Sequence, residues 1–153
     1  MKLNCDLGES FGAWSMPVEA AIMAEIDQAN IACGFHAGDP LVMKQAILSA
    51  KQHDVVIGAH PAYPDLQGFG RRSMAIAADE LSAMIQYQVS ALSGMAKVCG
   101  ANVSYVKPHG ALYNDMMKDT AVMRTVMQSI AEINMQSLNS PLALMVQATS
   151  QNA

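Results

Sequence analysis

The sequence predicts an α/β fold in which parallel strands form a (β/α) barrel with helices packed around it. Two observations predict this class. Short apolar runs alternate with longer segments of helical period along the 153 residues, and strands that alternate with helices form parallel sheets with right-handed crossovers. The first predicted strand is followed by no Gly-x-Gly-x-x-Gly fingerprint, and the chain has no phosphate-binding loop, which disfavours a nucleotide-binding open sheet.

The first two strands and helices follow from short local signals. Residues 3–7 predict a first short strand, and Pro17 begins a helical segment because proline suits the first turn of a helix. Residues 30–33 predict a second buried strand. Asp39 followed by Pro40 is a helix N-cap signal, and this helix runs to about residue 53. Its expected apolar stripe is Leu41, Val42, Ala46, Ile47 and Ala50.

The middle of the chain predicts a strand, a shaped loop and a long helix. Residues 55–59 are apolar, as in a buried strand. Residues 60–73 are rich in proline, glycine and aromatic side chains, which predicts a wall or lid over a ligand. A helical period then begins near Asp79, and Gly100 is a suitable residue just beyond its end.

The last third predicts two more strands with one helix between them. Residues 103–106 and 142–146 have the composition of short buried strands, and residues 122–133 have the period of an amphipathic helix. The predicted order is therefore β-α-β-α-β-α-β-α-β in a single domain over residues 1–153.

Polar side chains gather just beyond the predicted strands. In parallel α/β folds, functional groups lie at the carboxyl ends of the strands. Three of the four histidines and one lysine occupy such places, whereas His53 lies at the end of a helix. We therefore expect one functional site on the rim that the carboxyl ends of the strands form. Its candidate residues are Asn4, Asp6, Glu9, Asn30, His36, His60, Arg71, Arg72, Lys107, His109 and Tyr113.

Two chemistries fit these residues. Asp6, His60 and His109 are candidate ligands for a divalent metal, which would polarise a carbonyl group and lower the pKa of a bound water. Without a metal, Asp6 or a histidine would act as general base on water, and Lys107 or a histidine would stabilise the oxyanion. Arg71 and Arg72 suit a substrate carboxylate. The spacing of these residues does not distinguish the metal-dependent chemistry from the metal-free one.

Composition and charge exclude several classes of function. Hydrophobic residues make up 52% and charged residues 14%, which excludes a disordered chain. The net charge is -4 and the nine lysines and arginines are scattered, so nucleic acid is not an expected partner. No apolar run is long enough for a membrane helix, and none of secretory type lies at the start. Three widely spaced cysteines predict a reduced, cytoplasmic chain.

Four long segments resemble the motifs of the LamB/YcsF family. They are NCDLGESFG at 4–12, ANIACGFHAGDP at 29–40, GAHPAYPD at 58–65 with GFGRR at 68–72, and VKPHGALYN at 106–114. The resemblance implies a barrel of the seven-stranded glycoside hydrolase and deacetylase-like type. It also implies cleavage of the lactam amide of 5-oxo-L-proline to L-glutamate with ATP hydrolysis, in a complex with 5-oxoprolinase subunits B and C.

The resemblance implies a role for each candidate residue. Asp6, His60, Lys107 and His109 are the expected catalytic residues, and the remaining candidates are expected to bind substrate. ATP is expected to act through the complex, largely on the partner subunits, because this chain has no phosphate-binding loop. The alternatives are a metal-dependent deacetylase or carbohydrate hydrolase on the same barrel, and a non-catalytic chain that binds partners.

Members of the family continue through further β-α units, because a closed barrel takes roughly 200 to 250 residues. We therefore expect residues 1–153 to form about five β-α units of a barrel that is incomplete at its C-terminal end. An open sheet exposes two strand edges, which predicts self-association.

Overall fold

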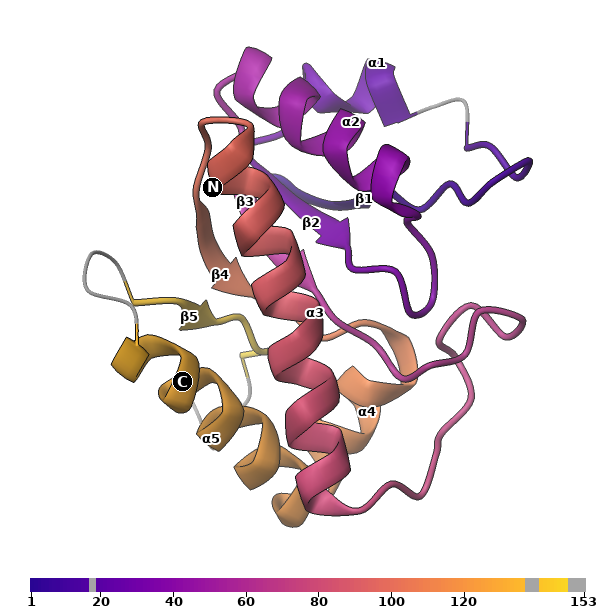
Figure 1. Cartoon of the computed structure of the whole chain (residues 1–153), viewed down its shortest axis with the longest axis vertical. Coiled ribbons are helices and arrows are strands. Elements are labelled where there is room, and N and C mark those ends of the chain that lie inside the picture. The colour runs from indigo at the N-terminus through magenta and orange to yellow at the C-terminus, as the bar shows by residue number, and fades with distance from the viewer. Residues whose placement is uncertain (17–18, 137–140, 149–153) are drawn as a thin grey trace.

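Five parallel strands form one sheet in the same order as in the sequence, β1-β2-β3-β4-β5 (Figure 1). The computed structural model describes residues 1–16, 19–136 and 141–148. Each crossover moves one strand further in the same direction, as in a barrel, whereas a doubly wound sheet reverses its order. The predicted α/β class is confirmed. The strands are β1 (Asn4–Leu7), β2 (Gln28–Ala32), β3 (Val56–His60), β4 (Val103–Val106) and β5 (Ala143–Leu144).

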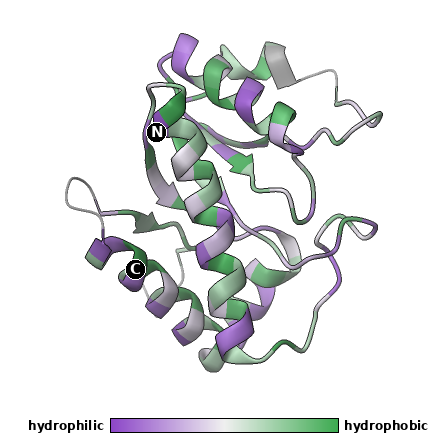
Figure 2. Cartoon of the chain, viewed as in Figure 1, coloured by the Kyte–Doolittle hydropathy of each residue, from purple (hydrophilic) through white to green (hydrophobic). Residues whose placement is uncertain are grey.

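Helices connect the strands, and Figure 2 shows hydrophobic and hydrophilic residues alternating along them. They are α1 (Glu19–Met23), α2 (Pro40–Gln52), α3 (Ala78–Val98), α4 (Gly110–Lys118) and α5 (Thr120–Gln136). Asp39 caps α2 as predicted, since its carboxylate accepts hydrogen bonds from Leu41 N at 2.9 Å and Val42 N at 3.0 Å. Gly100 follows α3 with a φ of 68°, which suits glycine. No helix in the described ranges is long and apolar enough to span a membrane.

The sequence prediction was wrong at three places. Helix α4 was missed, although Leu112 and Met116 are buried and one helical turn apart. Leu41 was expected in the core but is 63% exposed, and Met43 is buried on that face of α2 instead. Strand β5 has only two residues, Ala143 and Leu144. The predicted helix start at Pro17 lies outside the described residues.

The two faces of the sheet differ in polarity. Side chains alternate between faces along a strand, and paired residues of neighbouring strands share a face. Leu7, Ile31, Ala59 and Val106 form one such apolar row across β1 to β4. All four are buried, and α2 and α3 pack against β2, β3 and β4. Figure 1 shows α3 crossing the sheet at these strands. The core therefore lies between the helices and this face.

The opposite face is polar. The register aligns Asp6, Asn30, Gly58 and Tyr105 in one row across β1 to β4. His60 lies two residues beyond Gly58 and Lys107 two beyond Tyr105, so both share this face. Three functional groups expected from the sequence thus meet at the carboxyl ends of three strands.

The segment after β3 is held by buried polar contacts. Gln88 of α3 is fully buried, and its side-chain amide accepts from Ala62 N at 2.9 Å and donates to Ala62 O at 3.0 Å. The Tyr63 hydroxyl donates to Asp115 of α4 at 3.1 Å. Contacts with α3 and α4 therefore hold Ala62 and Tyr63 beside the strand ends, and a wall or lid over a ligand stays a prediction.

Candidate functional site

Asp6 is at the centre of the polar face. Lys107 Nζ donates to Asp6 Oδ1 at 2.7 Å, and Asn30 Nδ2 donates to the same oxygen at 2.6 Å. The other carboxylate oxygen, Oδ2, lies 3.3 Å from His60 Nε2. Residues from β1, β2, β3 and the end of β4 thus converge on one carboxylate.

These contacts set the charge of Asp6. Burial alone would raise the pKa of Asp6, but the hydrogen bonds and charge of His60 and the hydrogen bonds of Lys107 and Asn30 lower it far below its usual range. Asp6 is therefore ionised at neutral pH. A carboxylate held so strongly is a weak general base until one of its donors leaves.

Two histidines meet beside Asp6, and both are anchored to the main chain. His60 Nδ1 donates to Lys107 O at 2.5 Å, and His109 Nε2 donates to Phe69 O at 2.9 Å. The two remaining ring nitrogens, His60 Nε2 and His109 Nδ1, lie 2.9 Å apart. Burial, together with the nearby His36 and His60, lowers the pKa of His109 to about 4, so His109 is neutral at pH 7.

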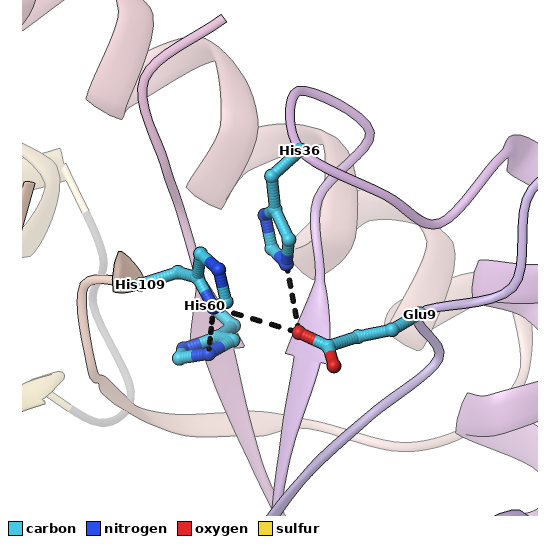
Figure 3. A group of neighbouring side chains, drawn as sticks. All are labelled: Glu9, His36, His60 and His109. Carbon is cyan, nitrogen blue, oxygen red and sulfur yellow. Dashed lines mark hydrogen bonds and ion pairs between the residues drawn. The ribbon is translucent and has the colours of Figure 1, made fainter. Parts of the chain in front are cut away.

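Glu9 and His36 complete the cluster (Figure 3). His36 Nε2 donates to Glu9 Oε1 at 2.9 Å, and Glu9 Oε1 lies 3.5 Å from His109 Nδ1. The His36 and His109 rings are stacked, with centroids 3.7 Å apart and planes 6° apart. Burial lowers the pKa of His36 to about 3 and raises that of Glu9. His36 thus lies behind the strand-end pocket, in contact with Glu9.

A cavity of about 500 Å³ opens at this rim. Of the candidate residues, it is lined by Asp6, His60, Arg71, Lys107, His109 and Tyr113. Its walls carry two cationic side chains, two imidazoles and one carboxylate. This is a suitable environment for a small molecule with a carboxylate and a carbonyl group.

Arg72 does not line this cavity, contrary to the role expected for it. Its guanidinium forms an ion pair with the buried carboxylate of Asp65 through Nη2, and its Nε lies 3.0 Å from Asp65 Oδ1. Asp65 also accepts from Gly68 N at 2.9 Å. Arg72 therefore stabilises the loop, and the neighbouring Arg71 is the arginine that faces the cavity.

A polar layer lies beneath Asp6, and one of its members was missed in the sequence. The Tyr105 hydroxyl donates to Asn30 Oδ1 at 2.7 Å and accepts from Asn4 Nδ2 at 3.0 Å. Asn4 and Asn30 are also bonded to each other. Asn30 thus holds the Asp6 carboxylate and Asn4 holds Asn30. Neither asparagine lines the cavity. Tyr105 lies inside a predicted strand, and only its register next to Gly58 reveals its role.

The cluster also supplies potential metal ligands. Glu9, His36, His60 and His109 each offer one ligand atom, and these atoms all lie within 4.8 Å of one another. This group shares His60 and His109 with the set expected from the sequence, but it contains Glu9 and His36 and does not include Asp6.

Comparisons with known proteins agree with the motifs. The family model described as LamB/YcsF family matches residues 1–153. The chain is 55% identical over 150 residues to a Pseudomonas putida protein named as a 5-oxoprolinase A subunit, and the match covers 98% of this chain and 56% of the relative. It is 51% identical over 152 residues to the 5-oxoprolinase A subunit of Vibrio cholerae, and this match covers 99% of the chain and 60% of the relative.

A solved structure has the same fold. The lactam utilization protein from Thermus thermophilus superposes with a TM-score of 0.91 at 39% identity, covering 99% of this chain and 60% of that one. The chain thus spans 56% to 60% of the length of these three relatives.

Proposed function

We propose that this chain, which belongs to the LamB/YcsF family, acts as part of the A subunit of an ATP-dependent 5-oxoprolinase. Its substrate would be 5-oxo-L-proline and its product L-glutamate, and its partners would be subunits B and C in the cytoplasm. One observation carries the proposal. It is the ion pair between Asp6 and Lys107, which lines a cavity of about 500 Å³ at the strand ends. The chain that carries this pair is 55% identical to a protein named as a 5-oxoprolinase A subunit.

The chemistry explains why ATP is needed. An unstrained lactam is a poor electrophile, so its amide must be activated before water attacks. Transfer of the terminal phosphoryl group of ATP to the amide oxygen would provide this activation. Water then adds to the ring carbon, the C–N bond breaks and the nitrogen takes a proton. A second water then hydrolyses the phosphate from the carboxyl group that has formed. The products are glutamate, ADP and phosphate.

Lys107 and Asp6 have linked roles in this proposal. The Lys107 ammonium stabilises negative charge that develops on the oxygen of the attacked carbon. As Lys107 moves to that oxygen, Asp6 loses one of the hydrogen bonds that lower its pKa and becomes a stronger base for the attacking water. Asn30 keeps the carboxylate in place, since it bonds the same oxygen at 2.6 Å.

Arg71 and Tyr113 are the proposed substrate-binding residues on the wall of the cavity. Arg71 is exposed, and its guanidinium lies 5.7 Å from the centre of the Phe69 ring, which leaves its donors available for the substrate carboxylate. Nucleotide chemistry is assigned largely to subunits B and C. Residues 1–153 are proposed to act as a single (β/α) domain.

The test is an assay of the chain with and without its proposed partners. The purified chain is mixed with subunits B and C from Pseudomonas fluorescens, ATP and 5-oxoproline, and glutamate is measured. The positive control is the 5-oxoprolinase A subunit of that organism, 54% identical to this chain over 150 residues. We expect glutamate only when all components are present. Turnover of 5-oxoproline by the chain alone with ATP would overturn the division of labour, and absence of glutamate would overturn activity for this chain.

A second candidate function is a metal-dependent deacetylase or carbohydrate hydrolase. The observation in its favour is the group of Glu9 and three histidines next to the cavity. A metal there would polarise a substrate carbonyl and lower the pKa of a bound water. Hydrolysis of an acetylated sugar that stops on adding a chelator, with no effect of ATP, would favour this function over the first.

A further inference from the structure

The turn after β3 contains a phenylalanine in a backbone conformation that normally favours glycine. Phe69 has a φ of 55°, and the next residue, Gly70, has a φ of 64°. A bulky residue rarely adopts this left-handed region, because its Cβ atom crowds the backbone, whereas glycine adopts it freely. Strain of this kind persists where the surrounding structure fixes it, and it is concentrated at functional sites. A strained phenylalanine where glycine would fit therefore points to a role for its ring.

Phe69 is fixed in the turn by its main chain and by its ring. Its carbonyl oxygen accepts from His109 Nε2 at 2.9 Å, and Gly70 N donates to Asp65 O at 2.8 Å. The ring meets two imidazoles nearly at right angles, with its centroid 5.5 Å from that of His36 and 5.3 Å from that of His109. Edge-to-face contacts are a favourable arrangement of aromatic rings. The Phe69 ring therefore has a defined orientation.

Arg71 lies over this ring. The Cζ atom of its guanidinium is 5.7 Å from the Phe69 centroid, within the range of a cation–π contact. Arg71 is exposed, and ordering an exposed arginine costs side-chain entropy when a ligand binds. A contact with a ring face uses none of the N–H donors of the guanidinium, which lie in its plane. A ring that holds Arg71 in advance therefore preserves its capacity for a bidentate contact with a carboxylate.

Phe69 can reach a bound molecule only through Arg71. Among the described residues, Arg71 and Lys107 line the cavity, whereas Phe69 does not. The adjacent Arg72 is held by the buried carboxylate of Asp65, so it does not take the place of Arg71. The contact between Phe69 and Arg71 thus determines which cation of the turn faces the cavity and in which orientation.

We propose that Phe69 is a positioning residue for substrate specificity. Its ring holds the Arg71 guanidinium toward the carboxylate of a cyclic amide, so that the cavity prefers a lactam with a carboxylate to the same lactam without one. The choice of substrate rests on the proposed function, because Arg71 lines the same cavity. The preference itself does not depend on ATP or on the groups that open the ring.

Equilibrium binding to the chain tests the proposal without turnover. NMR titration gives the Kd for 5-oxo-L-proline and for 2-pyrrolidinone, which is the same ring without the carboxylate. We expect the wild type to prefer 5-oxo-L-proline, and Phe69→Leu to bind 5-oxo-L-proline roughly threefold to tenfold more weakly with unchanged binding of 2-pyrrolidinone. Phe69→Tyr keeps the ring and should keep the preference. Phe69→Gly suits the left-handed backbone and provides the same test if Phe69→Leu fails to fold.

Two further variants separate the contact with Arg71 from general damage to the rim. Phe35→Leu is the matched control, because Phe35 is also partly exposed but its ring packs against Tyr87, with centroids 5.9 Å apart. It should keep the wild-type preference. In an Arg71→Met background, Phe69→Leu should have no further effect on the preference, since the two residues act through one contact.

Three results would overturn the proposal. They are a wild type without a preference for 5-oxo-L-proline, a Phe69→Leu variant with the wild-type preference, and an effect of Phe69→Leu that is equally large with and without Arg71. The proposed function has a separate outcome. If the preference exists and depends on Phe69 while the complex with subunits B and C forms no glutamate, the proposed function fails and the role of Phe69 stands.

Discussion

Asp65 is a buried carboxyl whose ionisation contributes to the stability of the loop after β3. The hydrogen bonds from Arg72 lower the pKa of Asp65 to about 2 in the folded chain. The pKa of an unfolded aspartate is about 3.9. Because the folded pKa is the lower one, this contribution is fully present above pH 4 and is lost as the pH falls toward 2.

We therefore predict that urea unfolding between pH 5 and pH 2 shows a larger loss of stability for the wild type than for Asp65→Asn, because other carboxyls with lowered pKa, such as Asp6, contribute the same loss in both proteins. Asp65→Asn should also be the less stable protein at pH 7, since its amide cannot pair with the Arg72 guanidinium. An equal loss in both proteins over this range would contradict the assignment. Asp79→Asn is a suitable control, because Asp79 is exposed at the start of α3.

The sequence was sufficient to place individual residues on the rim but not to pair them. Asp6, His60 and Lys107 each follow or end a predicted strand, and parallel strands bring such positions together. Arg72 pairs with Asp65 and its neighbour Arg71 faces the cavity. This contact lies within one loop, where the sequence has no periodicity that would predict it. The contact between Glu9 and His36 likewise depends on loop backbone geometry.

At the scale of elements, Gly58 of β3 is required by the packing of β4. A Cβ atom at this position would lie 2.1 Å from the ring of Tyr105, so no side chain fits without moving the ring. We predict that Gly58→Ala destabilises the fold by about 1–3 kcal/mol and displaces the hydroxyl that bonds Asn30.

Gly94 in α3 is the matched control. A Cβ atom at Gly94 meets nothing within 4 Å, and the residue lies in an exposed part of the helix. Gly94→Ala should therefore stabilise the chain by about 0.5–1 kcal/mol, because alanine loses less backbone entropy in a helix. Thermal unfolding of the two variants should give shifts of opposite sign. Shifts of the same sign would contradict the packing assigned to Gly58.

Elements with caps and long periods could be predicted, and short ones could not. Helices α2 and α3 carry clear start or stop signals at Asp39 and Gly100. Helix α4 begins directly after the rim residue His109, where the functional motif obscures the spacing of Leu112 and Met116. Strand β5 pairs with β4 through only two residues, so its bounds depend on the neighbouring strand and not on its own sequence.

At the scale of the molecule, strand order and polarity together explain the position of the site. A sheet whose order follows the sequence has its helices on one face, and here the other face is lined by Asp6, Asn30, His60, Tyr105 and Lys107. The 52% hydrophobic content fits a chain whose helices bury the apolar row of the sheet formed by Leu7, Ile31, Ala59 and Val106. Self-association through the edges at β1 and β5 stays a prediction.

In the proposed function, Lys107 and Asp6 open the lactam ring at the polar face of the sheet. The most direct measurement is the kcat/KM for ATP-dependent glutamate formation by the assembled complex carrying Lys107→Met, with the exposed Lys44→Met as control. We predict a loss of at least about 100-fold for Lys107→Met, with unchanged folding by circular dichroism and no loss for the control. Activity of Lys107→Met within about twofold of the wild type would contradict the claim.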